Sequence, residues 1–131
     1  AAFLSGGIGI TPIRSICKYL ADTGSSASVL VLYCARTVGD LVFVEDFEEM
    51  EEKAPGLSFT YLVTDEQPPA GWEGRAEEIN AEIVREEIPD YRERPFYICG
   101  PPGMVKAMAG ILTEDLDMSP DKVITENFAG Y

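Results

Sequence analysis

The sequence predicts an α/β protein built on an open parallel β-sheet with helices on both faces. Short apolar runs of strand length alternate with helix-patterned segments from one end of the chain to the other. Residues 29–34 are almost continuously apolar, as expected of a strand that is covered on both faces. The 131 residues suit a single domain with a sizeable core.

The first predicted unit is a strand, a glycine-rich turn and a helix. Residues 1–5 are apolar enough for a buried strand, and glycines follow in the turn at 6–12. Ile13, Ile16, Cys17 and Leu20 recur at helical spacing and predict one buried stripe, in a helix that ends near residue 21. We expect Thr11 to cap this helix, with Pro12 at its first position.

The next segments repeat the alternation. A strand at 29–34 leads through a loop at 35–40 into a helix, for which Asp40 is the expected cap. Phe43, Phe47 and Met50 mark the predicted inward face of that helix, with Val44 beside them. A third strand follows at 57–64, and then a long loop at 65–75.

The last third of the chain contains two more helices and two more strands. Ala76, Ile79 and Ile83 suggest a weaker third helix, stopped by Pro89. Residues 95–99 form the predicted fourth strand, and the turn at 100–103 begins a fourth helix. The apolar face of that helix is formed by Met104, Met108, Ile111 and Leu112. A fifth strand at 123–125 precedes the tail at 126–131.

Composition excludes several functional classes. A net charge of −13 argues against duplex nucleic acid and anionic membranes, and a well-solvated acidic surface explains it more simply than a basic partner protein does. The chain has no histidine, and its three cysteines are widely separated, so we expect no metal site and no Ser-His-Asp site. An odd number of cysteines and no membrane-length apolar run indicate a cytoplasmic protein.

The turn after the first strand has the chemistry of a phosphate site. Backbone N–H groups and the positive end of a helix dipole converge there, and glycines allow a ligand to approach closely. Gly7-Ile8-Gly9 gives G-x-G, but Pro12 stands where the strict dinucleotide pattern has its third glycine. A tight turn without a ligand is therefore the alternative. If the first and fourth strands are neighbours, this turn faces the one at 100–103 across a crevice.

Three motifs in order resemble the pyridine-nucleotide domain of the ferredoxin–NADP reductase superfamily. They are SGGIGITP at residues 5–12, YICGPPGM at 97–104 and TENFAGY at 125–131. The segments ART at 35–37 and WEGR at 72–75 are similar to the bacterial and archaeal flavin reductases of that group. The resemblance covers essentially the whole chain. It implies a three-layer, doubly wound, Rossmann-like fold whose five parallel strands have the order 3-2-1-4-5.

The resemblance also implies the roles of individual residues. Gly7, Gly9 and Thr11 would hold the pyrophosphate, and Arg36 would approach the adenosine ribose or its 2′-phosphate. The turn that begins at Cys99 would lie beside the nicotinamide, with the tail residues Glu126 and Phe128 near nicotinamide and flavin. The complete cofactor-binding set implied in this way is Gly6, Gly7, Gly9, Thr11, Pro12, Arg36, Arg75, Gly100, Pro101, Pro102 and Met104.

Members of this superfamily carry an N-terminal flavin-binding barrel with an R-x-Y-[ST] motif, which this sequence lacks. We therefore expect residues 1–131 to be the NAD(P)-binding domain of a longer flavoprotein reductase, inactive without the FAD domain. That reductase would transfer hydride between NAD(P)H and FAD and pass electrons to an iron–sulfur or other electron-transfer protein.

Other interpretations remain open from the sequence. Arg36 and the lack of a carboxylate directly after the second strand favour NADP slightly, whereas the nearby Asp40 keeps NAD possible. Arg75 could serve the nucleotide or simply offset nearby glutamates, and Cys99 could be an ordinary buried residue. Two other functions are alternatives: a non-catalytic nucleotide-sensing or interaction module, and a flavodoxin-like domain that binds its own flavin mononucleotide.

Overall fold

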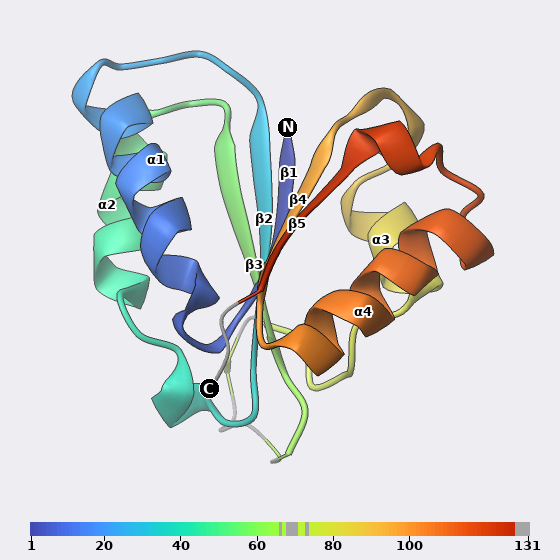
Figure 1. Ribbon diagram of the computed structural model, residues 1–131. Helices are drawn as coiled ribbons and strands as arrows, with labels where there is room; N and C mark the ends of the chain where they lie inside the picture. Colours follow the sequence, from blue (N-terminus) through green and yellow to red (C-terminus); the bar gives the residue numbers. More distant parts are fainter. Residues whose placement is uncertain (66, 68–70, 73, 128–131) are drawn as a thin grey trace.

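The computed structural model describes residues 1–65, 67, 71–72 and 74–127. In this part of the chain, all strands form one parallel sheet of five, ordered β3-β2-β1-β4-β5 (Figure 1). Both the fold class and the strand order are therefore confirmed. The tail residue Phe128 and its neighbours 129–131 lie outside the described residues.

The elements follow one another as the alternation predicts. The strands are β1 (Ala2–Gly6), β2 (Val29–Ala35), β3 (Leu57–Val63), β4 (Phe96–Gly100) and β5 (Val123–Asn127). The helices are α1 (Ile10–Asp22), α2 (Val44–Lys53), α3 (Ala81–Glu87) and α4 (Pro102–Gly110). A single π-helical turn, Ile111–Asp115, continues α4, and short 3₁₀ turns lie at Gly7–Gly9, Val38–Asp40, Tyr91–Glu93 and Pro120–Lys122.

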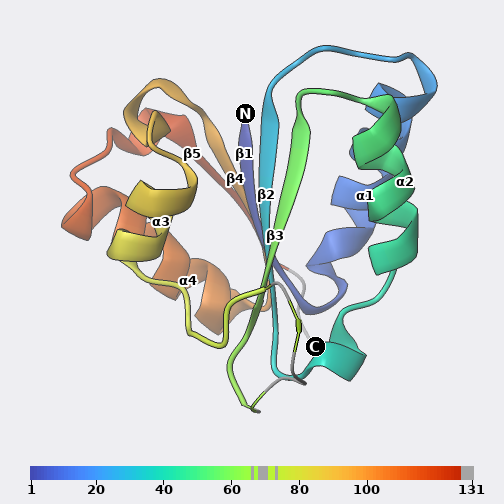
Figure 2. The same cartoon turned by 180° about the vertical axis from the view of Figure 1, so that it is seen from behind.

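Helices cover the sheet from both sides (Figures 1 and 2). The helices α1 and α2 lie on one face, and α3 and α4 lie on the other. Alternate residues of each strand therefore enter two separate cores: Phe3 and Val31 pack beneath α1 and α2, whereas Leu4 and Leu32 pack beneath α3 and α4. All five residues of β1 are buried, which explains why its sequence is apolar without alternation.

The winding of the sheet reverses between β1 and β4. These strands are hydrogen-bonded neighbours, with Ser5 opposite Cys99 at their carboxyl ends. The two glycine turns that follow them therefore begin at the same edge of the sheet. This is the arrangement in which open α/β sheets hold ligands.

Two predicted helix caps are wrong. The helix α1 begins at Ile10, because the 3₁₀ turn Gly7–Gly9 runs straight into it; Gly9 is the N-cap and no side chain caps the helix. Thr11 and Pro12 are consequently inside the first turn. Asp40 lies in a 3₁₀ turn and accepts a hydrogen bond from Thr37 Oγ1 at 3.0 Å, whereas α2 begins after Phe43, whose φ is +66°.

Three predictions of inward-facing or helical residues also fail. Ile16 is 45% exposed, because α1 turns Ile10, Ile13, Cys17 and Ala21 toward the sheet instead. Phe43 is 40% exposed, and Phe47 and Met50 form the buried face of α2. The third helix begins at Ala81, after Asn80 caps it by accepting from the Ile83 N–H, so Ala76 and Ile79 precede it.

Among the described residues, we find no helix whose length and apolar character would let it cross a membrane.

Candidate functional site

The two glycine turns are in direct contact. A Cβ placed on Gly9 would collide with the carbonyl oxygen of Cys99 and would lie 2.8 Å from the amide nitrogen of Gly100. Real Cβ atoms do not approach backbone atoms this closely, so only glycine allows the start of α1 to pack on the end of β4. The two turns therefore form one continuous rim.

Met104 joins the same two turns from the side of α4. A Cβ on Gly6 would collide with the Met104 sulfur, and a Cβ on Gly100 would collide with its terminal methyl carbon. The thioether therefore lies over both glycines, while the remainder of Met104 packs against the core beneath α3 and α4. In this way Met104 positions the start of α4 against the carboxyl ends of β1 and β4.

Two helices begin at this rim with open space beside their first residues. Gly7 has a φ of +57°, and an added Cβ there would meet no atom within 4 Å; the same is true of the space beside Gly103 in α4. In the described chain, neither α1 nor α4 has a side chain that caps its N-terminus. Uncapped N–H groups and two helix dipoles are therefore available to an anion. Gly103 was not among the predicted site residues, although its place after Pro102 at a helix start is a usable signal.

Cys99 and Glu126 are register partners at the carboxyl ends of β4 and β5. The Cys99 side chain is buried, and burial raises the pKa of its thiol, to which the Glu126 carboxylate adds. The thiol is therefore protonated near neutral pH and is poorly suited to act as a nucleophile. Phe128, which was predicted to lie nearby, is outside the described residues.

Arg36 extends from the end of β2 into solvent. Its side chain is 81% exposed, and its Nε lies 2.6 Å from Oδ2 of Asp65. This ion pair lowers the pKa of the Asp65 carboxyl. Arg36 is thus at the same carboxyl edge of the sheet as the glycine turns, with a carboxylate as its present partner.

The structure does not bring Arg75 to the glycine turns. Its backbone extends the outer edge of β3, where its N–H donates to Tyr61 and its carbonyl accepts from Val63. Its guanidinium lies 2.7 Å from Glu86 and 2.8 Å from Glu87, and both carboxylates raise the pKa of Arg75. These contacts agree with the alternative interpretation that Arg75 neutralises the charge of nearby glutamates.

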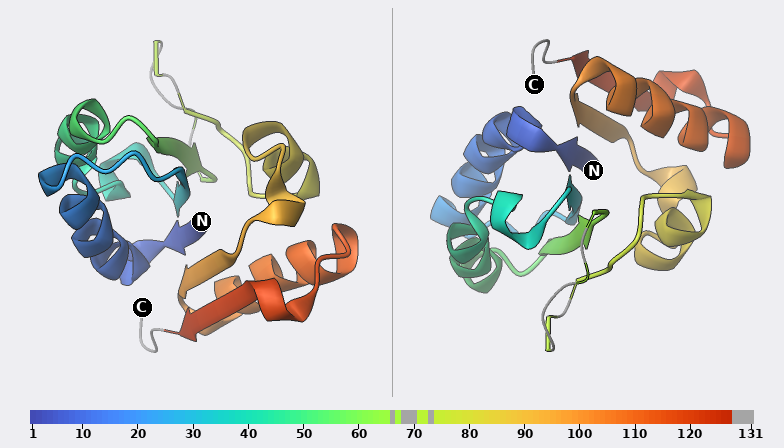
Figure 3. Two further views of the ribbon diagram at one scale, coloured as in Figure 1. Left: turned by 90° about the horizontal axis from the view of Figure 1, so that it is seen from above. Right: turned by 90° about the horizontal axis from the view of Figure 1, so that it is seen from below.

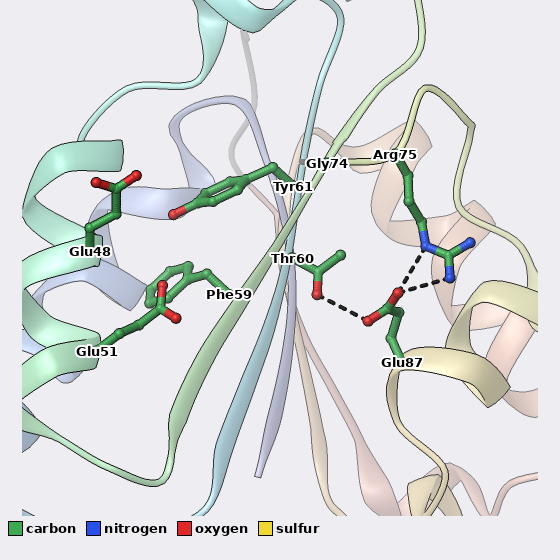
Figure 4. Close-up of a pocket in the computed structure, with 8 residues that line it drawn as sticks. All are labelled: Glu48, Glu51, Phe59, Thr60, Tyr61, Gly74, Arg75 and Glu87. Carbon is green, nitrogen blue, oxygen red and sulfur yellow. Dashed lines mark hydrogen bonds and ion pairs between the residues drawn. The ribbon is translucent and has the colours of Figure 1, made fainter. Parts of the chain in front are cut away.

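A pocket of about 660 Å³ lies at this outer edge of β3, away from the glycine turns (Figure 4). Its lining residues are Glu48, Glu51, Phe59, Thr60, Tyr61, Gly74, Arg75 and Glu87. Burial raises the pKa of Glu51, and Glu87 accepts hydrogen bonds from Thr60 and Arg75. Apart from Arg75, the lining contains no predicted cofactor residue. The acidic lining makes this pocket unfavourable for a diphosphate.

A comparison with known protein families identifies a family whose sequence model covers both glycine turns. The sequence model of the oxidoreductase NAD-binding domain matches residues 3–110. The chain belongs to this family. The matched segment includes both glycine turns, which follow the paired strands β1 and β4.

Individual relatives are redox proteins of greater length. The chain is 28% identical over 132 aligned residues to one subunit of the Na⁺-translocating NADH-quinone reductase of a Marinomonas species, covering 98% of this chain and 32% of that protein. It is 31% identical over 121 residues to the glycine betaine monooxygenase reductase subunit of Chromohalobacter salexigens, covering 88% of this chain and 32% of the relative. The chain thus spans about a third of the length of these relatives.

A solved structure shares the fold closely. The Amycolatopsis cytochrome P450 reductase GcoB superposes with a TM-score of 0.81 at 29% identity, over 98% of this chain and 37% of that one. The oxidoreductase NAD-binding domain described here is therefore similar in both sequence and backbone to one part of a longer reductase.

Proposed function

We propose that the rim formed by the two glycine turns binds NAD(P)H. The observation that carries this proposal is the packing of Gly9 on Cys99 and Gly100, which unites two uncapped helix starts at one edge of the sheet. A dinucleotide has a diphosphate in its centre and needs such a site for it. The open space beside Gly7 and Gly103 fits an elongated anionic ligand better than the acidic pocket at β3 does.

Each end of the rim would hold a different part of the nucleotide. Gly7, Gly9 and Thr11 would bind the pyrophosphate through the start of α1. The turn from Cys99 to Pro102 would position the nicotinamide, with Glu126 beside it on β5. Arg36 at the end of β2 would approach the adenosine ribose. To do so, its guanidinium would either break the ion pair with Asp65 or contact Asp65 and the ribose together. The protonated Cys99 thiol would act by shape and polarity rather than by attack on the ligand.

In the whole protein, we propose that this domain is the NAD(P)H side of a flavoprotein reductase. There the rim would hold the nicotinamide so that its hydride could pass to FAD, and the two cofactors would supply the redox chemistry. The protein's part is to hold the donor in line and to exclude water, so a general base is unnecessary and the absence of histidine is no obstacle. FAD would be held mainly by another domain, and an iron–sulfur or other electron-transfer protein would be the next partner.

Titration with NADH and with NADPH tests the nucleotide site. We expect saturable calorimetric binding of at least one nucleotide, with amide shifts in the NMR spectrum centred on Gly7, Gly9 and Gly100. Replacement Thr11→Asp puts a carboxylate at the start of α1, where it suits the helix dipole but repels a diphosphate. It should weaken binding at least about tenfold without lowering the melting temperature.

Ser15→Asp, at an exposed position one turn further along α1, is the matched control and should bind like the parent protein. Shifts confined to the pocket around Tyr61 and Glu87 would place the ligand elsewhere. A protein without affinity for either nucleotide would refute the proposed function.

A further inference from the structure

The strand β3 forms one edge of the sheet, with α2 on one face and α3 on the other (Figure 3). The pocket of Figure 4 opens at this edge and is called here the β3-edge pocket. Its volume of about 660 Å³ lies within the range of sites that hold small molecules. All of its lining residues lie outside the two glycine turns, so a ligand here would be distinct from one at the rim.

Side chains of β3 reach the pocket from both faces of the sheet. Thr60 points toward α3, where its hydroxyl donates to Glu87 at 3.2 Å. Glu87 also accepts from Nε of Arg75 at 2.9 Å. The charged lining residues on this side are therefore paired with each other.

The carboxylates on the α2 side of the pocket have no such cation. Glu48 and Glu51 lie three residues apart on α2 and so share one side of the helix. The ion pairs of the described chain include neither of them. Burial raises the pKa of Glu51 and the charge of Glu48 adds to this, although a hydrogen bond from the Phe59 N–H opposes it. A cation between the two carboxylates would relieve their repulsion.

The hydroxyl of Tyr61 is a further polar group on the α2 side. Figure 4 shows it pointing toward α2, on the same side of β3 as Glu48 and Glu51. Its oxygen is buried and has no hydrogen-bond partner among the described residues. Burial and the two carboxylates raise the pKa of Tyr61, so the phenol stays neutral. A buried hydroxyl without a partner is unfavourable, and a ligand that supplies the partner gains stability from it.

Aromatic rings form another wall of the pocket on this side. Phe59 and Tyr61 are two residues apart on β3 and point to the same face, with their ring centroids 6.2 Å apart and the ring planes 17° from parallel. Phe47 of α2 stacks on Phe59 at a centroid distance of 4.3 Å and fixes its orientation. Faces of aromatic rings attract cations. The rings and the carboxylates therefore favour the same class of ligand.

The donors and acceptors of the pocket narrow this class. Carboxylates only accept hydrogen bonds, so the ligand must supply N–H donors together with positive charge. In the part of the chain that the structure describes, no group of three or more acidic, cysteine or histidine side chains could hold a metal ion, which favours an organic cation. We propose that the β3-edge pocket binds a small organic cation through an ammonium group that contacts Glu48, Glu51 and Tyr61. This site does not depend on the proposed function.

Titration with butylammonium chloride at constant ionic strength tests the site. We expect saturable NMR shifts centred on the amides of Phe59 and Tyr61, while those of Gly7 and Gly100 stay unchanged. Butan-1-ol has a similar chain without the charge and should bind at least about tenfold more weakly. Shifts at Phe59 and Tyr61 that do not saturate, or that butan-1-ol reproduces equally, would overturn the proposal.

Two isosteric substitutions on α2 separate a specific site from general attraction to an acidic helix. Glu51→Gln removes a charge that lines the pocket and should weaken butylammonium binding at least about tenfold. Glu49→Gln removes the same charge from an exposed position that does not line the pocket, and should bind like the parent protein. Equal weakening by the two substitutions would refute a specific site.

Tyr61→Phe tests the hydroxyl apart from any change in charge. It should weaken butylammonium binding at least about threefold without lowering the melting temperature of the free protein, because the hydroxyl that it removes is unpaired. Binding at the parent affinity would contradict the contact with Tyr61. If an oligolysine peptide saturates the same amides and butylammonium does not, the pocket receives a side chain of a basic partner protein, and the small-molecule site is refuted.

Discussion

The hydroxyl of Ser5 is a buried polar group that lowers the stability of the folded state. Its side chain is fully buried at the end of β1, and its hydroxyl has no hydrogen-bond partner among the described residues. A buried hydroxyl that loses its water without finding a partner destabilises the folded state. Ser5 directly precedes the glycine turn, so the strand carries this polar group next to the candidate site.

Replacement of Ser5 by alanine should therefore raise the free energy of unfolding by about 1 kcal/mol, because the unpaired hydroxyl is removed and little volume is lost. Urea unfolding followed by circular dichroism measures this change. Ser28→Ala is the control, because the Ser28 hydroxyl accepts from Arg94 Nη2 at 2.7 Å and its loss should destabilise. A Ser5→Ala protein less stable than its parent would contradict the assignment of an unpaired hydroxyl.

The buried cysteines lower the free energy of unfolding at alkaline pH. Burial raises the pKa of Cys34 to about 12, with a smaller contribution from Glu78. Below the pKa of the unfolded state, the thiol is protonated in both the folded and the unfolded protein, and it does not change the free energy of unfolding. The folded state loses stability as the pH rises from the unfolded value of 9.0 toward the folded one.

At pH 10 we expect Cys34 to cost about 1.4 kcal/mol relative to pH 7, since each unit between the two pKa values corresponds to about that energy. The measurement is the difference in unfolding free energy between the two pH values for the parent protein and for Cys34→Ala. The subtraction removes contributions that both proteins share, including that of Cys17, whose pKa burial also raises to about 12. Identical pH dependence in the two proteins would show that Cys34 ionises normally.

Among the elements, the end of the last helix carries local backbone strain. The π-helical turn Ile111–Asp115 closes with the Met118 N–H donating to the Leu112 carbonyl at 2.9 Å, and this requires a φ of +52° at Asp117. Residues with a Cβ tolerate this left-handed conformation poorly, and glycine adopts it freely.

Asp117→Gly should therefore stabilise the fold by up to about 1 kcal/mol, measured as a rise in the melting temperature. Asp115→Gly, two residues earlier in the helical turn, should have the opposite effect, because glycine is unfavourable inside a helix. If both substitutions destabilise alike, the backbone at Asp117 is under no strain that glycine relieves.

The apolar spacing in the sequence predicted which segments are helices better than it predicted which side of each helix is buried. The spacing of apolar residues indicated α1 correctly, yet both Ile16 and Leu20 fit the same stripe as Ile13 and Cys17. Which flank is buried depends on the neighbour, and here α2 binds Arg14 while the flank with Ile16 stays open. The predicted Thr11 cap is wrong because the 3₁₀ turn Gly7–Gly9 runs directly into α1, and the predicted Asp40 cap is wrong because α2 begins only after Phe43.

For the molecule as a whole, the proposed chemistry needs more than this domain. On the proposed function, the chain would supply one wall of a hydride-transfer site, and another domain would orient the flavin against the nicotinamide. We therefore expect the 131-residue chain, mixed with NAD(P)H and free FAD, to give no turnover above that of the two cofactors without protein. Loss of nicotinamide absorbance measures it, with heat-denatured chain as the control. Protein-dependent turnover well above this background would contradict the expectation that a flavin-binding domain is required for turnover.

The parallel sheet, its alternation with helices and the glycine turns could be predicted from the sequence, because they depend on local patterns of apolar and small residues. The strand order came from the resemblance of three motifs to a known superfamily, and the β1–β4 pairing confirms it. Local patterns could not predict the partners of Arg36 and Arg75, the position of Met104 over Gly6 and Gly100, or the exposure of Ile16. Each depends on which residues distant in sequence meet in space, and a charge or an apolar side chain acquires its partner only when the chain has folded.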